Sequence, residues 1–152
     1  MKKIIISLIA LVALSTAAHA QYNNALGIRA GYGTAFGAEL SYQTYLGNIN
    51  RVELDLGARL YTDYSALSLA AIYQWHWFLA GGFGFYIGPG AEAFLSDHTF
   101  GIGVGGQIGI DYQFNAPFQI SLDWRPIYDF VGHVPGDNRF NYGGALGIRY
   151  AF

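Results

Sequence analysis

The chain has 152 residues, and only 12% of them are charged, about half the share of roughly 25% that is usual in soluble domains. It contains no cysteine, which excludes a disulfide framework and thiol chemistry. Beyond residue 20 it carries six arginines against ten acids, a formal charge of −4. This balance excludes the basic surface with which proteins bind nucleic acid.

Residues 1–20 are typical of a secretory signal peptide. A basic start and an apolar stretch lead to a small-residue pattern at Ala18 and Ala20. Cleavage is therefore expected before Gln21, and the chain is expected to be exported. Residues 21–152 then leave room for one domain and no more.

Eight segments follow in which apolar and polar residues alternate with period two, and turn residues separate them. Dividing the 132 remaining residues by eight gives 16.5 residues per segment and connection. That length suits membrane-spanning strands of about 9–11 residues joined by short turns. The sequence therefore predicts eight strands and no helix. Their approximate ranges are 25–32, 37–46, 51–61, 66–78, 83–95, 100–114, 118–130 and 140–152.

Each segment divides into an apolar face without charge and a face that combines charged, polar and small residues. An eight-stranded barrel has a lumen just wide enough for side chains, so its inward positions must include many small ones. Ten charges turned toward lipid would cost a few tens of kcal/mol, more than the ~5–15 kcal/mol stability of an ordinary fold. We therefore expect the charged face to point inward. Its ionisable members are Arg29, Glu39, Glu53, Asp55, Arg59, His76, Glu92, Asp111, Asp123, Arg125 and Arg149.

Bulky aromatic residues gather near the ends of the predicted strands, on the apolar face. Trp77, Phe83 and Tyr150 lie toward one rim, and Tyr32 and Tyr142 lie toward the other. Two aromatic girdles that flank an aliphatic band are typical of proteins that cross both interfaces of a bilayer.

The chain ends in YGGALGIRYAF, where Leu146, Ile148, Tyr150 and the terminal Phe152 share the apolar face. This pattern resembles the C-terminal assembly signal of bacterial outer-membrane proteins.

With its signal peptide and eight amphipathic segments, the whole mature chain resembles the small outer-membrane barrels of the porin family, which include outer-membrane proteins X and W. The resemblance implies an all-β fold, an eight-stranded antiparallel up-and-down transmembrane β-barrel. It also implies a place in the Gram-negative outer membrane, with both termini in the periplasm. Its expected partners are membrane lipid and the barrel-assembly machinery, and the expected oligomeric state is a monomer.

Hairpin spacing predicts which inward side chains meet. A connected polar plug whose members satisfy one another is expected, which favours a structural scaffold without throughput. The expected neighbours are Arg29 with Glu39, Glu39 with Arg59, Asp55 with Gln43, Glu53 with Gln74 or His76, and Asp111 with Gln119 or Ser121.

Two alternatives keep the membrane barrel but let solutes pass. One is a narrow channel, and the other is a lateral route for small or hydrophobic molecules. Pro89 and Pro126 lie inside predicted strands, where the missing N–H predicts local unpairing or a bulge. We interpret them as an irregularity near the edge of the membrane rather than a side opening.

Two further alternatives belong to other classes. A lipid A-modifying enzyme would need a nucleophile and a base within hydrogen-bond reach, and a soluble lipocalin-like carrier would turn the apolar face inward. We expect no cofactor and no metal site, because no suitable ligand spacing or phosphate-binding loop is present. The candidates for catalysis are Ser96, Asp97 and His98, and His133 with Asp137.

Overall fold

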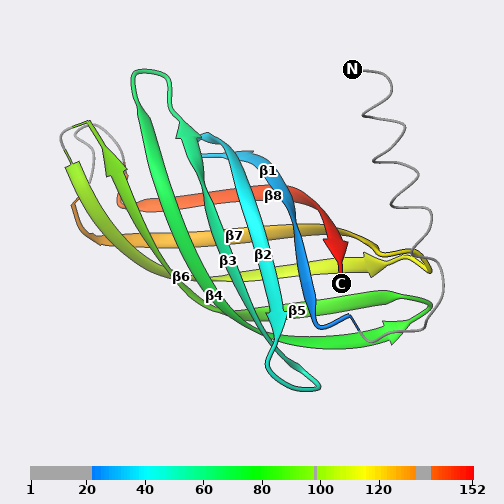
Figure 1. Cartoon of the computed structure of the whole chain (residues 1–152). Coiled ribbons are helices and arrows are strands. Elements are labelled where there is room, and N and C mark those ends of the chain that lie inside the picture. Colours follow the sequence, from blue (N-terminus) through cyan, green and yellow to red (C-terminus); the bar gives the residue numbers. More distant parts are fainter. Residues whose placement is uncertain (1–21, 98, 133–137) are drawn as a thin grey trace, which may run out of the picture.

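A computed structural model describes residues 22–97, 99–132 and 138–152. The eight predicted strands form a closed antiparallel barrel, in which neighbours in the chain pair with each other and β1 pairs with β8 (Figure 1). The predicted fold class is confirmed. The strands are β1 Asn24–Gly33, β2 Phe36–Tyr45, β3 Asn50–Leu60, β4 Ser65–Ala80, β5 Phe83–Ser96, β6 Thr99–Gln113, β7 Phe118–Val131 and β8 Phe140–Ala151.

The strand boundaries differ from the predicted ones by at most two residues. The largest difference is at the end of β4, which extends to Ala80 rather than to the predicted Phe78. The β4–β5 connection shows why turn residues predict the strand boundaries accurately. Gly81 and Gly82 both have positive φ, +58° and +89°. A two-residue hairpin with positive φ at both positions matches the right-handed twist of its strands, and glycine adopts that geometry without strain. No helix in the described part of the chain is long and apolar enough to span a membrane.

The apolar face points outward and the charged face points inward. Leu122 and Ile148 are 55% and 48% exposed, whereas their neighbours Asp123 and Arg149 are 4% and 0% exposed. Within the described strands every charged side chain lies on the inward face, and the exposed charges lie in the connections. The alternative of a lipocalin-like barrel with an apolar lumen is therefore wrong.

The two ends of the barrel differ in what they carry. We call the rim with the start of β1, the end of β8 and the connections 46–49, 81–82 and 114–117 the terminus end, and the opposite rim the loop end. Aromatic rings meet at both: Phe118 and Tyr150 are 5.8 Å apart at the terminus end, and Phe140 and Tyr142 are 6.1 Å apart at the loop end. The two girdles predicted from the sequence are present.

Small residues make room for large ones inside the barrel. A Cβ placed on Gly109 of β6 would lie 2.5 Å from the Tyr86 ring and 2.7 Å from Cβ of Asp123. At Gly57 of β3 it would lie 2.6 Å from Cα and Cγ of Glu39. Both distances are shorter than carbon atoms tolerate, so bulky side chains cross the lumen only because glycine faces them.

The two strand prolines lie elsewhere than expected. Pro89 and Pro126 fall near the middle of β5 and β7 rather than at the edge, and Pro89 lies opposite Gly106 of β6. The pairing of β6 with β7 passes from Gly105 directly to Ile108, across the position of Pro126. Because proline donates no backbone hydrogen bond, the ladder is interrupted there.

Candidate functional site: the charged lumen

The candidate site is the lumen itself, because strand alternation places ionisable side chains from all eight strands inside the barrel. Arginine guanidinium groups and carboxylates alternate there and are almost fully buried. Charges of this kind are stable only when they are paired and hydrogen-bonded. We call the connected set the lumen network, and it contains Arg29, Glu39, Arg51, Glu53, Asp55, Gln74, Gln107, Asp111, Asp123, Arg125 and Arg149, with their hydrogen-bond partners.

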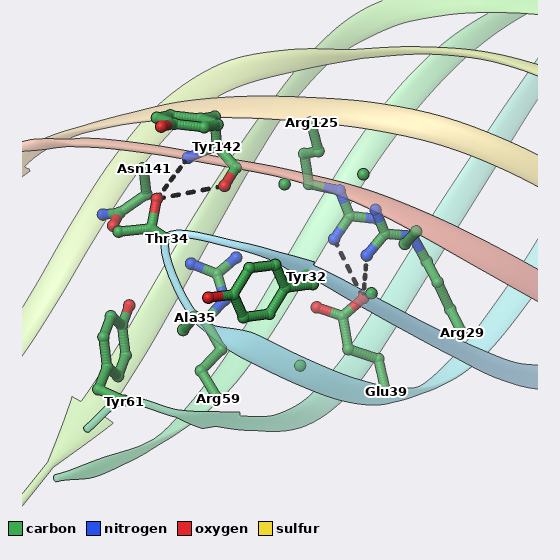
Figure 2. Close-up of a pocket in the computed structure, with 15 residues that line it drawn as sticks. Arg29, Tyr32, Thr34, Ala35, Glu39, Arg59, Tyr61, Arg125, Asn141 and Tyr142 are labelled. Carbon is green, nitrogen blue, oxygen red and sulfur yellow. Dashed lines mark hydrogen bonds and ion pairs between the residues drawn. The ribbon is translucent and has the colours of Figure 1, made fainter. Parts of the chain in front are cut away.

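Two arginines from different strands converge on Glu39. Arg29 Nη1 lies 2.6 Å and Arg125 Nη1 lies 3.4 Å from Glu39 Oε2 (Figure 2). Arg29 also forms an ion pair with Asp123, and Arg125 forms one with Asp55. Planar guanidinium groups can bridge two carboxylates in this way because their five N–H donors form a rigid fork.

Glu53 lies at the centre of the lumen network. Its carboxylate is paired with Arg125 at 3.0 Å and with Arg149 at 3.2 Å. The amides of Gln74 and Gln107 each donate to it at 3.1 Å. All of these partners come from other strands, so Glu53 links distant walls of the barrel.

A second group lies toward the terminus end, around Asp111. Arg51 Nη1 lies 2.8 Å and His76 Nε2 lies 2.9 Å from its carboxylate oxygens. The ring of Tyr86 lies 4.6 Å from the Arg51 guanidinium carbon, and the Tyr45 hydroxyl lies 3.1 Å from His76 Nδ1. Aromatic faces and a buried ion pair together fill this section of the lumen.

The loop end is closed by separate pairs. Arg59 forms an ion pair with Glu92, and the amide of Asn141 donates to Asp129. Between Arg59 and the Glu39 group lies a cavity of about 50 Å³ (Figure 2). That volume holds a few water molecules at most.

No protein-family model and no curated protein sequence matches the chain. Among solved structures, the barrel is similar to the crystal structure of Neisserial surface protein A (NspA), with a TM-score of 0.65 at 16% sequence identity. The match covers 85% of this chain and 94% of NspA. This chain has the fold of the small outer-membrane β-barrels.

A second outer-membrane barrel supports the same conclusion. The N-terminal β-barrel domain of Pseudomonas aeruginosa OprF matches with a TM-score of 0.59 at 17% identity. It covers 86% of this chain and 98% of the OprF domain. Both outer-membrane barrels match over nearly their whole length, so the similarity concerns the complete closed barrel. At these identities it establishes the fold alone.

Within this outer-membrane barrel fold, the structure places all the inward residues named from the sequence inside the lumen. Some predicted neighbours meet: Arg29 pairs with Glu39, and Gln74 donates to Glu53. Gln119 likewise donates to Asp111 at 3.1 Å.

Two pairs of predicted neighbours lie within one pairing step in the register, but their main partners are other residues. Glu39 lies between Arg29 and Arg125, whereas Arg59 pairs with Glu92. Asp55 lies opposite Ser41 in the register rather than Gln43, and its ion-pair partner is Arg125 of β7. Hairpin spacing considers only adjacent strands, whereas Arg59–Glu92, Glu39–Arg125 and Asp55–Arg125 are ion pairs between non-adjacent ones.

The expectation that the network satisfies itself is wrong in part. Among the described residues, Arg51 Nη2, Asp55 Oδ1 and Arg125 Nε are buried without a protein hydrogen-bond partner. The fixed positions of the strands limit how many donors and acceptors can meet, and such atoms are commonly satisfied by water.

Sequence reasoning missed several inward residues, and three of them can ionise. Arg51, Tyr86 and Asp129 are all buried in the lumen. Their positions follow the alternation of their own strands, because Arg51 shares the parity of Glu53, and Asp129 shares that of Arg125. Parity alone could have identified all three.

The residues of the predicted assembly signal lie on the outward face of β8. Leu146, Ile148 and Phe152 are exposed, and Tyr150 contacts Phe118 of β7.

Two of the catalytic candidates, Ser96 and Asp97, lie at the loop end. Ser96 donates its hydroxyl to the backbone oxygen of Ser65 at 3.0 Å, and Asp97 is exposed. His98, His133 and Asp137 lie outside the described residues, as does the predicted signal peptide. Across the described ranges, no three His, Asp or Glu side chains are grouped as a metal site would require.

Proposed function

We propose that this chain is an integral outer-membrane β-barrel that acts as a structural scaffold, with a lumen closed to solutes. The observation that carries this proposal is the burial of the lumen network. Arg51, Glu53 and Arg149 are each 0% exposed, although they lie on the barrel axis. A continuous aqueous pore would leave such side chains accessible to water, and open channels are a property of wider barrels.

The outer surface supports a place in the membrane. An uncharged aliphatic band lies between two aromatic girdles, and the closed barrel has no free strand edge. Hydrocarbon requires both features, because it offers no hydrogen bonds to backbone groups or charges. In this proposal lipid is the main partner of the monomer, and the terminus end faces the periplasm.

The proposed route to the membrane uses both ends of the sequence. The signal segment directs export, and the outward face of β8 is recognised by the barrel-assembly machinery through strand addition at a sheet edge. The scaffold role includes no chemical reaction, since the hydroxyl of Ser96 is donated to a backbone carbonyl rather than to a base.

Single-channel recording in planar bilayers tests the closed lumen. The refolded wild-type barrel should show no steady conductance, and neither should the Asp63→Ala variant, whose exposed side chain lies in the β3–β4 connection. Glu39→Ala removes a carboxylate that holds two arginines. The proposal would be contradicted if the wild-type barrel showed steady channel openings whose conductance changed in Glu39→Ala but not in Asp63→Ala.

A further inference from the structure

A cavity of about 530 Å³ opens at the terminus end of the barrel. It lies between the start of β1, the connections β2–β3, β4–β5 and β6–β7, and the end of β8. We call it the vestibule. Its volume is within the range of roughly 300–1,000 Å³ found for small-molecule sites, and it is about ten times larger than the cavity at the loop end.

The described residues that line the vestibule carry no charge, in contrast to the lumen network directly beyond it. Seven of them are asparagine or glutamine, and these come from several strands and turns. No lining side chain would offer an ionic ligand an opposite charge to replace the hydration that it loses there. The lining therefore selects for a neutral ligand that is rich in hydrogen-bonding groups.

Two of these amides have an unused acceptor. Gln43 donates to Glu53, and Gln119 donates to Asp111 at 3.1 Å. The Oε1 atom of each is buried without a protein hydrogen-bond partner, and both residues are at most 5% exposed. Because their N–H groups are held by carboxylates, the amides are fixed with one oxygen left for a donor. They require a partner that supplies O–H or N–H groups.

Aromatic rings line the same cavity. Phe78 stacks against Tyr45 with 6.5 Å between ring centroids and an interplanar angle of 21°. Phe78 is 62% exposed, and Phe114 on the β6–β7 connection is 41% exposed. Flat apolar rings beside amide acceptors match one ligand class in particular, because a sugar ring has an apolar C–H face and a rim of hydroxyl donors.

We propose that the vestibule binds a neutral oligosaccharide. Gln43 and Gln119 accept hydrogen bonds from its hydroxyl or acetamido groups, and the exposed rings of Phe78 and Phe114 stack on its sugar faces. The binding does not need an open lumen, so it is independent of whether the barrel conducts.

The test is a titration of the full chain, refolded in dodecylphosphocholine micelles so that no detergent carries a sugar headgroup. Chitotriose and maltotriose serve as probes, and amide chemical shifts report on binding. We expect saturable shifts at the terminus end with at least one of them. Loss of one hydrogen bond should weaken binding about five- to tenfold in Gln43→Met and in Gln119→Met.

A matched control exists at the opposite rim. Asn141 also donates to a carboxylate, that of Asp129, and also has a buried oxygen without a protein partner. Asn141→Leu should therefore leave the dissociation constant within about twofold. If the buried glutamine variants do not fold, Phe78→Ser changes a ring that is 62% exposed and should weaken binding by a similar factor.

Three results would overturn the proposal. The first is no saturable shift with either sugar at about 10 mM, a concentration that detects even a weak site. The second is equal weakening by Asn141→Leu and Gln119→Met. The third is saturable binding of a fatty acid in the vestibule with no response to either sugar.

Discussion

Glu53 shows how one residue can hold opposite walls of the barrel together. Its carboxylate is 0% exposed and lies between the guanidinium groups of Arg125 and Arg149. Glu53→Gln keeps the shape but removes the charge, which leaves two buried arginines short of a counter-ion. Breaking a buried pair in this way costs about 3–5 kcal/mol. We expect a loss of about 3 kcal/mol in the free energy of unfolding, measured by urea titration in phosphatidylcholine vesicles.

The control for this substitution is Asp63→Asn, which changes an exposed carboxylate in the β3–β4 connection. Exposed substitutions of this kind usually stay within about 0.5 kcal/mol. A Glu53→Gln barrel as stable as the Asp63→Asn barrel would mean that the lumen network contributes little to stability.

Single residues also show which part of the site the sequence could predict. The inward direction of Asp55 or Arg125 follows from strand parity and from the cost of a charge in lipid. Their contact could not be predicted, because they are 70 residues apart and meet only once the barrel closes. The same holds for Arg29 and Asp123, which are 94 residues apart. Hairpin arithmetic reaches adjacent strands and no further.

At the level of strands, β6 depends on glycine where it faces the lumen. Gly109 lies so close to Tyr86 that an added Cβ would meet the ring at 2.5 Å. Gly109→Ala should displace that ring and the neighbouring Asp123, and such overpacking costs about 1–3 kcal/mol. The measurement is again the free energy of unfolding in lipid vesicles.

Gly47 in the β2–β3 connection provides the comparison. A Cβ there would have no heavy atom within 4 Å, and the backbone does not have positive φ. Gly47→Ala should therefore be neutral or slightly stabilising. If both substitutions have the same effect, the inward glycines serve strand flexibility rather than packing.

The strand boundaries could be predicted to within two residues because short polar turns separate segments in which apolar and polar residues alternate. The interruption around Pro89 and Pro126 was placed wrongly, because the sequence does not show how far each strand projects from the membrane. Once the register is known, both prolines lie in the middle of long strands, on either side of Gly106.

For the whole molecule, the decisive property is that the bilayer is the solvent of the outer surface. Leu40 of β2 lies between Ile28 and Leu56 in the aliphatic band, whereas Leu60 lies beside Phe36 at the loop end. An arginine facing lipid costs about 2–4 kcal/mol at the bilayer midplane and about 0–1 kcal/mol near an interface. Leu40→Arg should therefore destabilise the refolded barrel by about 2–4 kcal/mol, and Leu60→Arg should cost much less.

The same pair of variants separates a membrane barrel from any barrel that is surrounded by water. Both leucines are half exposed, at 54% and 53%, so in water the two substitutions would be similarly mild. Only a hydrocarbon slab creates a difference that depends on depth along the barrel axis. Urea titrations in vesicles and in mild micelles should show the difference as a larger loss for Leu40→Arg in vesicles. Equal losses for both variants in vesicles would place the aliphatic band outside the bilayer and contradict the membrane assignment.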